Sequence, residues 1–307
     1  MVLPSGPYSV ESPAEPALPE REATRFLAAL VELTKPGVGG LVVMTTLCGA
    51  LSAPGQLSLA RLLITIVGTG CVVGSANGLN MVIERDSDRL MRRTRTRPLP
   101  TGRLTVEQAV AFSLGLAALG LALLFAFVGT LPAVLTIAAL VSYVALYTPL
   151  KRVTPMALWV GAVPGAIPPL IGWASVTGSL SALAWSEFAI LFVWQLPHFL
   201  AIAIFRRDEY ARAGMRVLPV VHGVQRTKVE IAVYSTVLVA TSLSPVALGL
   251  AGMGYAVVCI ASGLSFLALA TAGLSVKNET QWARRVFFAS MPYLIVLLAS
   301  LAASTAL

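Results

Sequence analysis

Long apolar runs alternate with short polar loops along most of the chain, a pattern typical of a polytopic all-α membrane protein. A membrane-crossing helix needs about 20 predominantly apolar residues, and runs close to that length recur nine times. We predict membrane spans over residues 38–53, 62–83, 108–128, 131–148, 156–173, 183–205, 229–249, 252–273 and 287–305. The first run is short and the fifth contains three prolines, so both are expected to be kinked or broken.

Composition and charge support this architecture. The chain has 307 residues, of which 57% are hydrophobic and 12% charged, too apolar for a soluble domain. If the spans alternate in direction, only Arg61 of the 22 Lys and Arg residues lies on the side away from the N-terminus. The positive-inside rule then predicts a cytoplasmic N-terminus and a C-terminus outside. The net charge of +8 therefore reflects topology and an anionic ligand, and not nucleic acid, because short basic loops without interleaved aromatic residues do not suit that partner.

The sequence divides into a tail and one domain. Residues 1–24 are rich in Pro, Glu and Ser and are expected to form a disordered cytoplasmic tail. Residues 25–307 are expected to form a single nine-helix domain. The cysteines fall inside predicted spans, too far apart for a metal-ligand motif, and are interpreted as buried thiols. They are Cys48, Cys71 and Cys259.

The most informative polar residues lie where the second span reaches water. On a helix, Asn80, Glu84 and Asp88 fall on one stripe. An amide and two carboxylates at a membrane boundary need a positive partner, and Mg²⁺ prefers such oxygen ligands and usually binds substrate phosphates as well. Asp86 points to the other side of a helix. Either the helix ends near Glu84 and the loop turns Asp86 back towards the stripe, or Asp86 pairs with an arginine such as Arg89 or Arg93.

Four arginines follow this stripe at once. Guanidinium groups are well suited to phosphate, because they donate paired hydrogen bonds from a fixed plane. Acids that hold a metal beside arginines that hold phosphate indicate a diphosphate site at the membrane face. The arginines are Arg92, Arg93, Arg95 and Arg97.

A second polar cluster follows the sixth span. If the helix stays regular after Pro197, His198, Arg206 and Glu209 lie within about 80° of one another. Glu209 is then the better second metal ligand, with Asp208 a competitor. An imidazole deep in a span is either functional or a neutral group that bonds to the next helix, and both interpretations of His198 stay open.

Two smaller polar sites are ambiguous by themselves. Tyr147 and Lys151 follow the fourth span, and Lys35 precedes the first. An interfacial tyrosine and cations that set topology would explain them fully. His222, in the loop after the sixth span, is expected to lie outside the chemistry.

Over about residues 30–305 the chain resembles the UbiA-type intramembrane prenyltransferases. The likeness rests on two acidic motifs, Asn80-x-x-x-Glu84-x-x-x-Asp88 and Asp208-Glu209, and on Tyr147-x-x-x-Lys151. A narrower likeness to heme-prenylating members rests on Met91-x-Arg93-Thr94-x-x-Arg97-Pro98, Trp194-Gln195-x-Pro197-His198-Phe199 and Gly161-Ala162-x-Pro164-Gly165-Ala166-x-Pro168-Pro169-x-x-Gly172-Trp173. The chain departs from the family in having Glu84 and Glu209 where Asp is usual, and Gly37 where Arg is common.

The resemblance implies a nine-helix bundle around a central cavity, and a Mg²⁺-dependent transferase. It would move the farnesyl group of farnesyl diphosphate to a vinyl group of heme B with addition of water, giving heme O and diphosphate for terminal oxidases. One or two Mg²⁺ ions would be the cofactor, and heme B a substrate rather than a prosthetic group. The implied metal ligands are Asn80, Glu84, Asp88 and Glu209, with Asp208 as the alternative to Glu209. The implied diphosphate contacts are Arg93, Arg97, Tyr147, Lys151, Lys35 and Arg206, while His198 would contact the heme or orient the water.

The resemblance also implies a place in the bacterial cytoplasmic (inner) membrane, with the mouth of the active site on the cytoplasmic face. Heme A synthase and oxidase assembly factors are the candidate protein partners. Three other functions compete: a sister enzyme that prenylates a quinone precursor or other aromatic acceptor, a transporter, and a non-catalytic oxidase assembly subunit. A transporter is expected to carry charge near mid-membrane, whereas the acids here gather at one face. An assembly subunit would leave them without a purpose.

Overall fold

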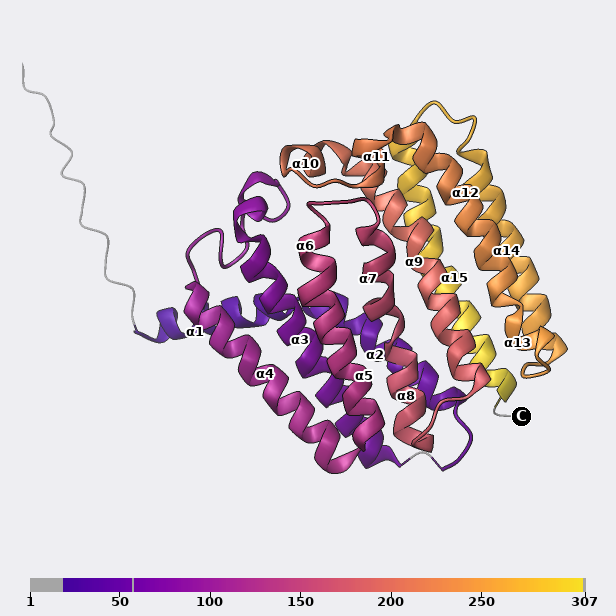
Figure 1. The fold of residues 1–307 in the computed structure, drawn as a ribbon, viewed down its shortest axis with the longest axis horizontal. Coiled ribbons are helices and arrows are strands. Elements are labelled where there is room, and N and C mark those ends of the chain that lie inside the picture. Colours follow the sequence, from indigo (N-terminus) through magenta and orange to yellow (C-terminus); the bar gives the residue numbers. More distant parts are fainter. Residues whose placement is uncertain (1–18, 57, 306–307) are drawn as a thin grey trace, which may run out of the picture.

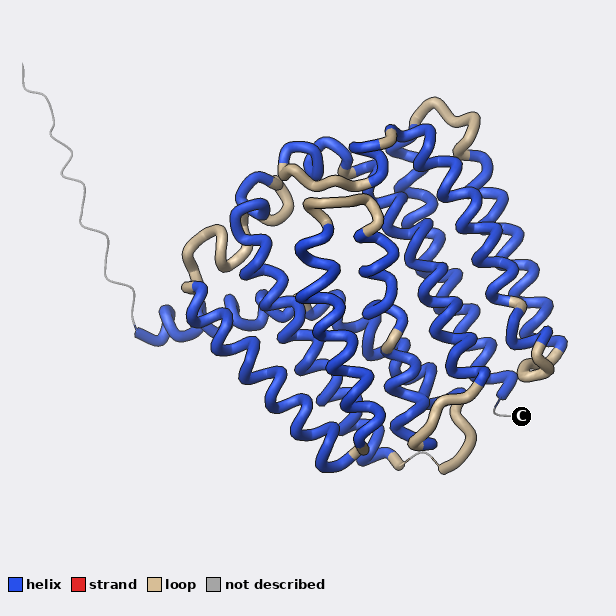
Figure 2. Tube along the Cα trace, in the orientation of Figure 1, coloured by secondary structure: helices blue, strands red, loops and turns tan. Residues whose placement is uncertain are grey.

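The computed structural model describes residues 19–56 and 58–305, and every regular element within them is helical (Figures 1 and 2). A π-helical stretch, Ser142–Tyr147, joins α5 to α6. The helices are α1 (Pro19–Thr34), α2 (Pro36–Ser52), α3 (Leu59–Leu90), α4 (Val106–Phe127), α5 (Thr130–Val141), α6 (Thr148–Leu150), α7 (Ala157–Ala166), α8 (Pro168–Thr177), α9 (Ala182–Phe205), α10 (Arg207–Arg212), α11 (Leu218–Val221), α12 (Gly223–Ser242), α13 (Ser244–Ala247), α14 (Met253–Ala272) and α15 (Glu279–Thr305).

The predicted membrane-spanning architecture is confirmed. In the described part of the chain, eight helical segments are long and apolar enough to cross a membrane, and the bent pair Glu22–Thr34 and Pro36–Ser52 makes a ninth. The apolar runs underestimate the lengths of some helices, because these helices also include polar and charged residues next to the apolar run. Thus α12 begins at Gly223 instead of residue 229, and α15 begins at Glu279 instead of residue 287.

Local sequence explains where several helices begin and break. The fifth span divides into α7 and α8 ahead of Pro168, because a proline has no N–H for the helix ladder. The first span bends by 47° between α1 and α2. Lys35 at this bend has a left-handed backbone (φ 51°), and Pro36 follows it. At the start of α4, Thr105 and Gln108 form the reciprocal capping box that their spacing predicts.

The N-terminal helix α1 is amphipathic. It buries Ala29 and Leu33 against Met81 of α3, while Leu27 and Val31 stay exposed. A helix of this kind suits the membrane interface. Because α1 begins at Pro19, residues 19–24 of the expected tail are helical, and residues 1–18 lie outside the described residues.

Close helix contacts hold the bundle together. α3 packs along α4, α2 along α8, and α9 against both α12 and α15. Small residues permit the close approach of α2 and α8: a Cβ on Gly172 would collide with the carbonyl oxygen of Thr46. Such small-residue interfaces are typical of membrane helices. All three cysteines are free, with Cys259 buried and Cys48 and Cys71 half-buried.

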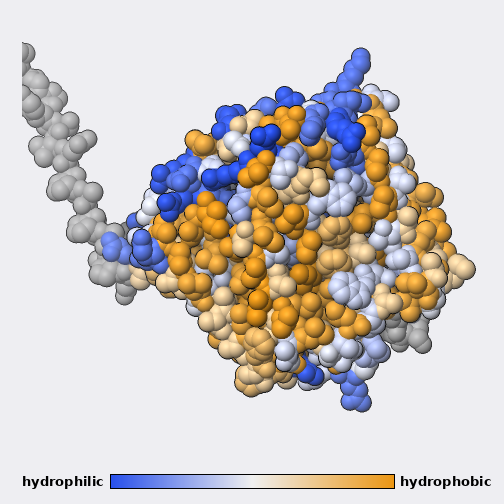
Figure 3. Space-filling view, in the orientation of Figure 1, coloured by the Kyte–Doolittle hydropathy of each residue, from blue (hydrophilic) through white to orange (hydrophobic). Residues whose placement is uncertain are grey.

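The molecule has an apolar belt and one strongly polar end (Figure 3). Hydrophilic residues gather along the upper edge of the view, where α10 and α11 lie in Figure 1. The loops that follow α3, α6 and α14 lie at this same end (Figure 1), as the alternation of spans predicts. Side-chain packing of Met91 with Tyr210 and Met215 joins the end of α3 to α10 and its loop. That this end faces the cytoplasm stays a prediction.

Candidate active site

α3 places the three predicted metal ligands on one buried face. The helix runs unbroken to Leu90, so Asn80, Glu84 and Asp88 follow one another at single-turn spacing, with 1%, 6% and 0% exposure. The predicted stripe is therefore present. The side chain of Asp86 is 69% exposed and pairs with Arg85 at 3.7 Å. No loop turns Asp86 back towards the stripe, and its partner is Arg85 instead of Arg89 or Arg93.

Both buried carboxylates are paired with a cation. Lys151 Nζ donates to Glu84 Oε1 at 2.6 Å, and Arg97 Nη1 donates to Asp88 Oδ2 at 2.7 Å. Burial opposes the charge of Lys151, but Tyr147 and Glu84 more than offset it, so the pKa of Lys151 lies above its ordinary value. The site therefore contains matched opposite charges in a region with little access to water.

The amide of Asn80 is held from both ends. Lys35 Nζ, at the bend between α1 and α2, donates to Asn80 Oδ1 at 2.9 Å. Asn80 Nδ2 donates to Thr148 Oγ1 at 3.1 Å, and this hydroxyl donates in turn to the carbonyl oxygen of Tyr143 at 2.8 Å. The orientation of the Asn80 amide is thus fixed by residues from two other segments.

The Tyr147-x-x-x-Lys151 motif acts as one unit. The π-helical stretch ends at Tyr147, and such stretches often occur at functional sites. Lys151 Nζ lies 4.5 Å from the centre of the Tyr147 ring, a cation–π contact. Gly161 of α7 leaves room for the ring, because a Cβ at this position would collide with it. The tyrosine thus helps to hold the lysine beside α3.

The second acidic cluster differs from the sequence prediction in one respect. α9 ends at Phe205 and α10 begins at Arg207, and Arg206 between them is not helical (φ −112°, ψ 10°). The condition of a regular helix through to Glu209, on which the facing argument depended, is therefore not met. Glu209 is still the more enclosed acid: its side chain is 16% exposed and pairs with Arg206 at 3.2 Å. Asp208 is 84% exposed and lies 3.9 Å from Arg207, so it points to solvent.

The segment after α9 reaches the α3 site through Tyr210 and the following loop. Burial is the main cause that raises the pKa of Tyr210, and Tyr147 adds to the rise while Arg93 opposes it. Tyr210 also packs against Met91 at the end of α3. The backbone N–H of Arg216 donates to the carbonyl oxygen of Lys151 at 3.0 Å, which ties the loop after α10 to the loop after α6.

His198 contributes to helix packing. Its Nδ1 lies 2.7 Å from the Ser290 hydroxyl on α15, and its ring stacks on Trp194 with centres 4.6 Å apart. Trp194 Nε1 also donates to the Ser290 carbonyl oxygen at 2.7 Å. This matches the interpretation of an imidazole that bonds to a neighbouring helix. His222 is exposed between α11 and α12, and its place outside the chemistry stays a prediction.

The sequence analysis did not identify two residues, Thr148 and Ser87, that form hydrogen bonds with side chains at the site. Thr148 holds Asn80, and Ser87 on α3 accepts a hydrogen bond from Arg152 Nη2 at 2.7 Å. Ser87 lies three residues after Glu84, and this helical spacing was an available signal. For Thr148, the sequence offered only its place next to Tyr147.

The donor set fits Mg²⁺. Asp88 Oδ1 is buried and has no hydrogen-bond partner, so it can accept a cation while Arg97 holds the other oxygen. Amide and carboxylate oxygens are the ligands that Mg²⁺ prefers. The described residues contain no metal-sized group of three His, Cys, Asp or Glu side chains, so the fit rests on the α3 set of one amide and two carboxylates.

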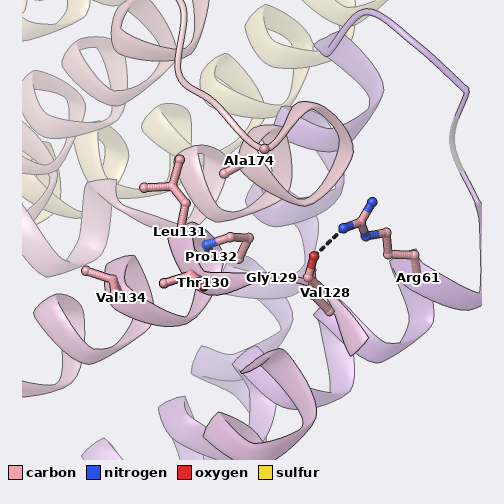
Figure 4. A pocket seen from close by; sticks show the side chains of 9 residues that line it. Arg61, Val128, Gly129, Thr130, Leu131, Pro132, Val134 and Ala174 are labelled. Atoms are coloured by element: carbon pink, nitrogen blue, oxygen red, sulfur yellow. Dashed lines mark hydrogen bonds between the residues drawn. The ribbon is translucent and has the colours of Figure 1, made fainter. Parts of the chain in front are cut away.

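A separate cavity lies near the start of α3, at the other end from the acids. It has a volume of ≈ 390 Å³ and is lined by Arg61, the loop into α5, and Ala174 (Figure 4). Arg61 Nη2 donates to the carbonyl oxygen of Val128 there. The substrate cavity expected beside the acids stays a prediction.

The fold and this arrangement of acids and cations define the chain as an intramembrane helical protein of the prenyltransferase class. The model of the UbiA prenyltransferase family matches residues 41–291, so the chain belongs to that family. Curated relatives named protoheme IX farnesyltransferase include one from Anaeromyxobacter dehalogenans (strain 2CP-C), 46% identical over 90% of this chain and 93% of the relative. Another, from Sorangium cellulosum (strain So ce56), is 50% identical over 81% of this chain and 87% of the relative.

Solved structures have the same fold at low sequence identity. One is digeranylgeranylglyceryl phosphate synthase, with a TM-score of 0.77 and 16% identity over 91% of this chain and 98% of that chain. A UbiA homolog from Archaeoglobus fulgidus bound to GPP and Mg²⁺ has a TM-score of 0.66 and 17% identity over 89% of this chain and 99% of that chain. The predicted nine-span, all-helical fold is thus a known one.

Proposed function

We propose that the protein transfers the farnesyl group of farnesyl diphosphate to a vinyl group of heme B, with addition of water, and so makes heme O for terminal oxidases. The observation that carries this proposal is the pairing of a buried amide–carboxylate stripe with three cations at the polar end of the bundle. This site suits a metal diphosphate, and the name of the relatives, which are 46% and 50% identical over most of the chain, supports heme as the acceptor.

Residues of this chain would stabilise the leaving diphosphate. Asn80, Glu84 and Asp88, with Glu209 from α10, would hold Mg²⁺, which when bound offsets the negative charge that grows on the leaving oxygens. Cations and one phenol would bind the remaining diphosphate oxygens. They are Lys35, Arg93, Arg97, Tyr147, Lys151 and Arg206.

The reaction balances with water as the third reactant. The bond between farnesyl carbon 1 and the diphosphate oxygen breaks, and a carbon–carbon bond forms to the outer vinyl carbon. A water oxygen then bonds to the inner vinyl carbon and releases one proton. The allylic cation requires a dry environment until the vinyl group reacts, and the apolar faces of α7 and α9 near the acids would supply it. His198 is buried in the contact between α9 and α15, and in this proposal it is a candidate to contact the heme or the water.

The protein would act in the bacterial cytoplasmic membrane with its polar end towards the cytoplasm. The concentration of Lys and Arg in the loops at that end supports this orientation. Alkaline phosphatase fused after Leu307 should be active, whereas the same reporter inserted after Arg212 should be inactive. The reverse result would overturn the orientation. Heme A synthase and oxidase assembly factors remain candidate recipients of the product.

The direct test uses the purified full chain in lipid vesicles with heme B, farnesyl diphosphate and Mg²⁺. Mass spectrometry of the extracted heme should show a gain of one farnesyl group plus water that depends on Mg²⁺. The competing function is prenylation of a quinone precursor or another aromatic acceptor. Farnesyl transfer to such an acceptor, with heme left unchanged, would contradict the heme assignment and retain the prenyltransferase class.

A further inference from the structure

The cations beside α3 have two possible partners. Lys151 and Arg97 are candidate diphosphate ligands, yet each is bonded to a carboxylate that is a candidate metal ligand. The side chains are well enclosed: Lys151 is 17% exposed and Glu84 is 7%. A buried carboxylate needs a positive partner, and here the protein itself supplies one for each acid.

This pairing affects how a divalent cation can bind. A metal that arrives alone meets carboxylates that are already neutralised, and it also meets the positive charges that neutralise them. If diphosphate arrives as well, each cation gains a new anionic partner, and the carboxylate becomes available to the metal. Binding of either component should therefore favour the other, and such coupling is reciprocal.

We infer that Lys151 and Arg97 exchange partners on substrate binding: each leaves its α3 carboxylate for the diphosphate as that carboxylate becomes a metal ligand. This inference rests on the proposed function, because it requires a metal-bound diphosphate at this site. It gives the two cations a role beyond diphosphate binding, since they also keep the metal site weak until the prenyl diphosphate is present.

The surroundings of Lys151 permit such an exchange by side-chain rotation alone. Its backbone carbonyl is held by the N–H of Arg216 at 3.0 Å, which anchors the main chain. Its ammonium group lies on a flexible four-carbon stem over the face of Tyr147. The ring contacts the ammonium at the same time as Glu84 does, so the charge keeps one favourable contact when it leaves the carboxylate.

Asp88 is prepared for the same change. Arg97 holds only Oδ2, and Oδ1 is buried without a hydrogen-bond partner. The carboxylate can therefore begin to coordinate through Oδ1 before Arg97 leaves Oδ2. The Arg97–Asp88 and Lys151–Glu84 pairs therefore both lead us to expect that the carboxylate changes its partner from the cation to the metal.

The test measures metal binding, with Mn²⁺ as a paramagnetic probe counted by electron paramagnetic resonance on the purified full chain. Titrations are run with and without farnesyl thiolodiphosphate, an analogue with sulfur in the bridging position. For the unmodified protein, the analogue should tighten Mn²⁺ binding at least about fivefold. In Lys151→Met, Mn²⁺ without the analogue should bind at least about fivefold tighter than in the unmodified protein, because Glu84 has lost its internal partner. Binding of the analogue should weaken in the same variant.

Lys228→Met is the matched control. Lys228 is also a buried lysine, 4% exposed, and pairs with Glu279 at 3.1 Å away from the acids. It should leave Mn²⁺ affinity unchanged. Arg97→Gln should strengthen binding of Mn²⁺ alone, as Lys151→Met does, and provides a second test if either variant folds poorly in a thermal unfolding assay.

Unchanged or weaker binding of Mn²⁺ alone to both folded variants would overturn the exchange. If the analogue still binds and heme is still farnesylated, the proposed function survives that result. If the analogue does not bind the unmodified protein at all, both the proposed function and the exchange fail.

Discussion

Asn80 on α3 and Thr148 at the start of α6 are joined by a buried hydrogen bond, in which Asn80 Nδ2 donates to Thr148 Oγ1 at 3.1 Å. Because the amide nitrogen is engaged there, the Asn80 oxygen faces Lys35 Nζ at 2.9 Å. The threonine therefore fixes which atom of the amide is offered to a cation. A residue that orients a ligand in this way can matter as much as the ligand itself.

Thr148→Val keeps the shape of the side chain and removes the acceptor. The Asn80 amide should then lose its fixed orientation, and the Mn²⁺ affinity and kcat/KM should fall about 10- to 100-fold. Thr136→Val is the matched control, since Thr136 is buried on α5 and bonds only to the Pro132 carbonyl oxygen within that helix. Equal effects of the two substitutions on Mn²⁺ affinity would show that Thr148 has no orienting role.

The acids of α10 should differ in importance. Glu209→Gln should lower kcat/KM at least about tenfold, because it removes a proposed metal ligand that is largely enclosed. Asp208→Asn should have little effect, since that side chain is 84% exposed and points to solvent. Steady-state assays of the two variants check this difference. A larger loss of kcat/KM for Asp208→Asn than for Glu209→Gln would indicate that Asp208 is the metal ligand.

The contact between α2 and α8 should be sensitive to a single methyl group. Gly172→Ala would push a Cβ into the Thr46 carbonyl oxygen, and overpacking of this kind costs about 1–3 kcal/mol of stability. Thermal unfolding in detergent should show a lower midpoint. In Gly70→Ala the new methyl group would have no neighbouring atom within 4 Å, so the midpoint should not fall. Equal midpoints for the two variants would refute the close-contact argument.

Local patterns in the sequence predicted much of this structure. Hydropathy located the spans, and the four-residue spacing placed Asn80, Glu84 and Asp88 on one face, because α3 is a regular helix. The capping box at Thr105 was likewise a local feature. In each case the physical cause acts within a few residues of the chain.

The features that could not be predicted depend on distant residues or on irregular backbone. The bond between Lys151 and Glu84 joins positions 67 residues apart, and that between His198 and Ser290 joins positions 92 apart. Because the helix breaks at Arg206, the angles calculated for a regular helix do not describe where Glu209 lies relative to His198. The π-helical stretch that ends at Tyr147 could not be predicted, because hydropathy does not distinguish a π-helical turn from an α-helical one.

The central claim is that the buried α3 acids bind the metal that drives farnesyl transfer to heme. The most direct measurement compares the Mg²⁺-dependent rate of heme farnesylation, followed by mass spectrometry, for Asp88→Asn and Asp86→Asn in vesicles with equal amounts of inserted protein. Asp88→Asn should lower turnover at least about a hundredfold, because the proposed buried metal ligand loses its charge. Asp86→Asn should retain turnover, because that side chain is 69% exposed. Near-normal turnover of Asp88→Asn would contradict the account.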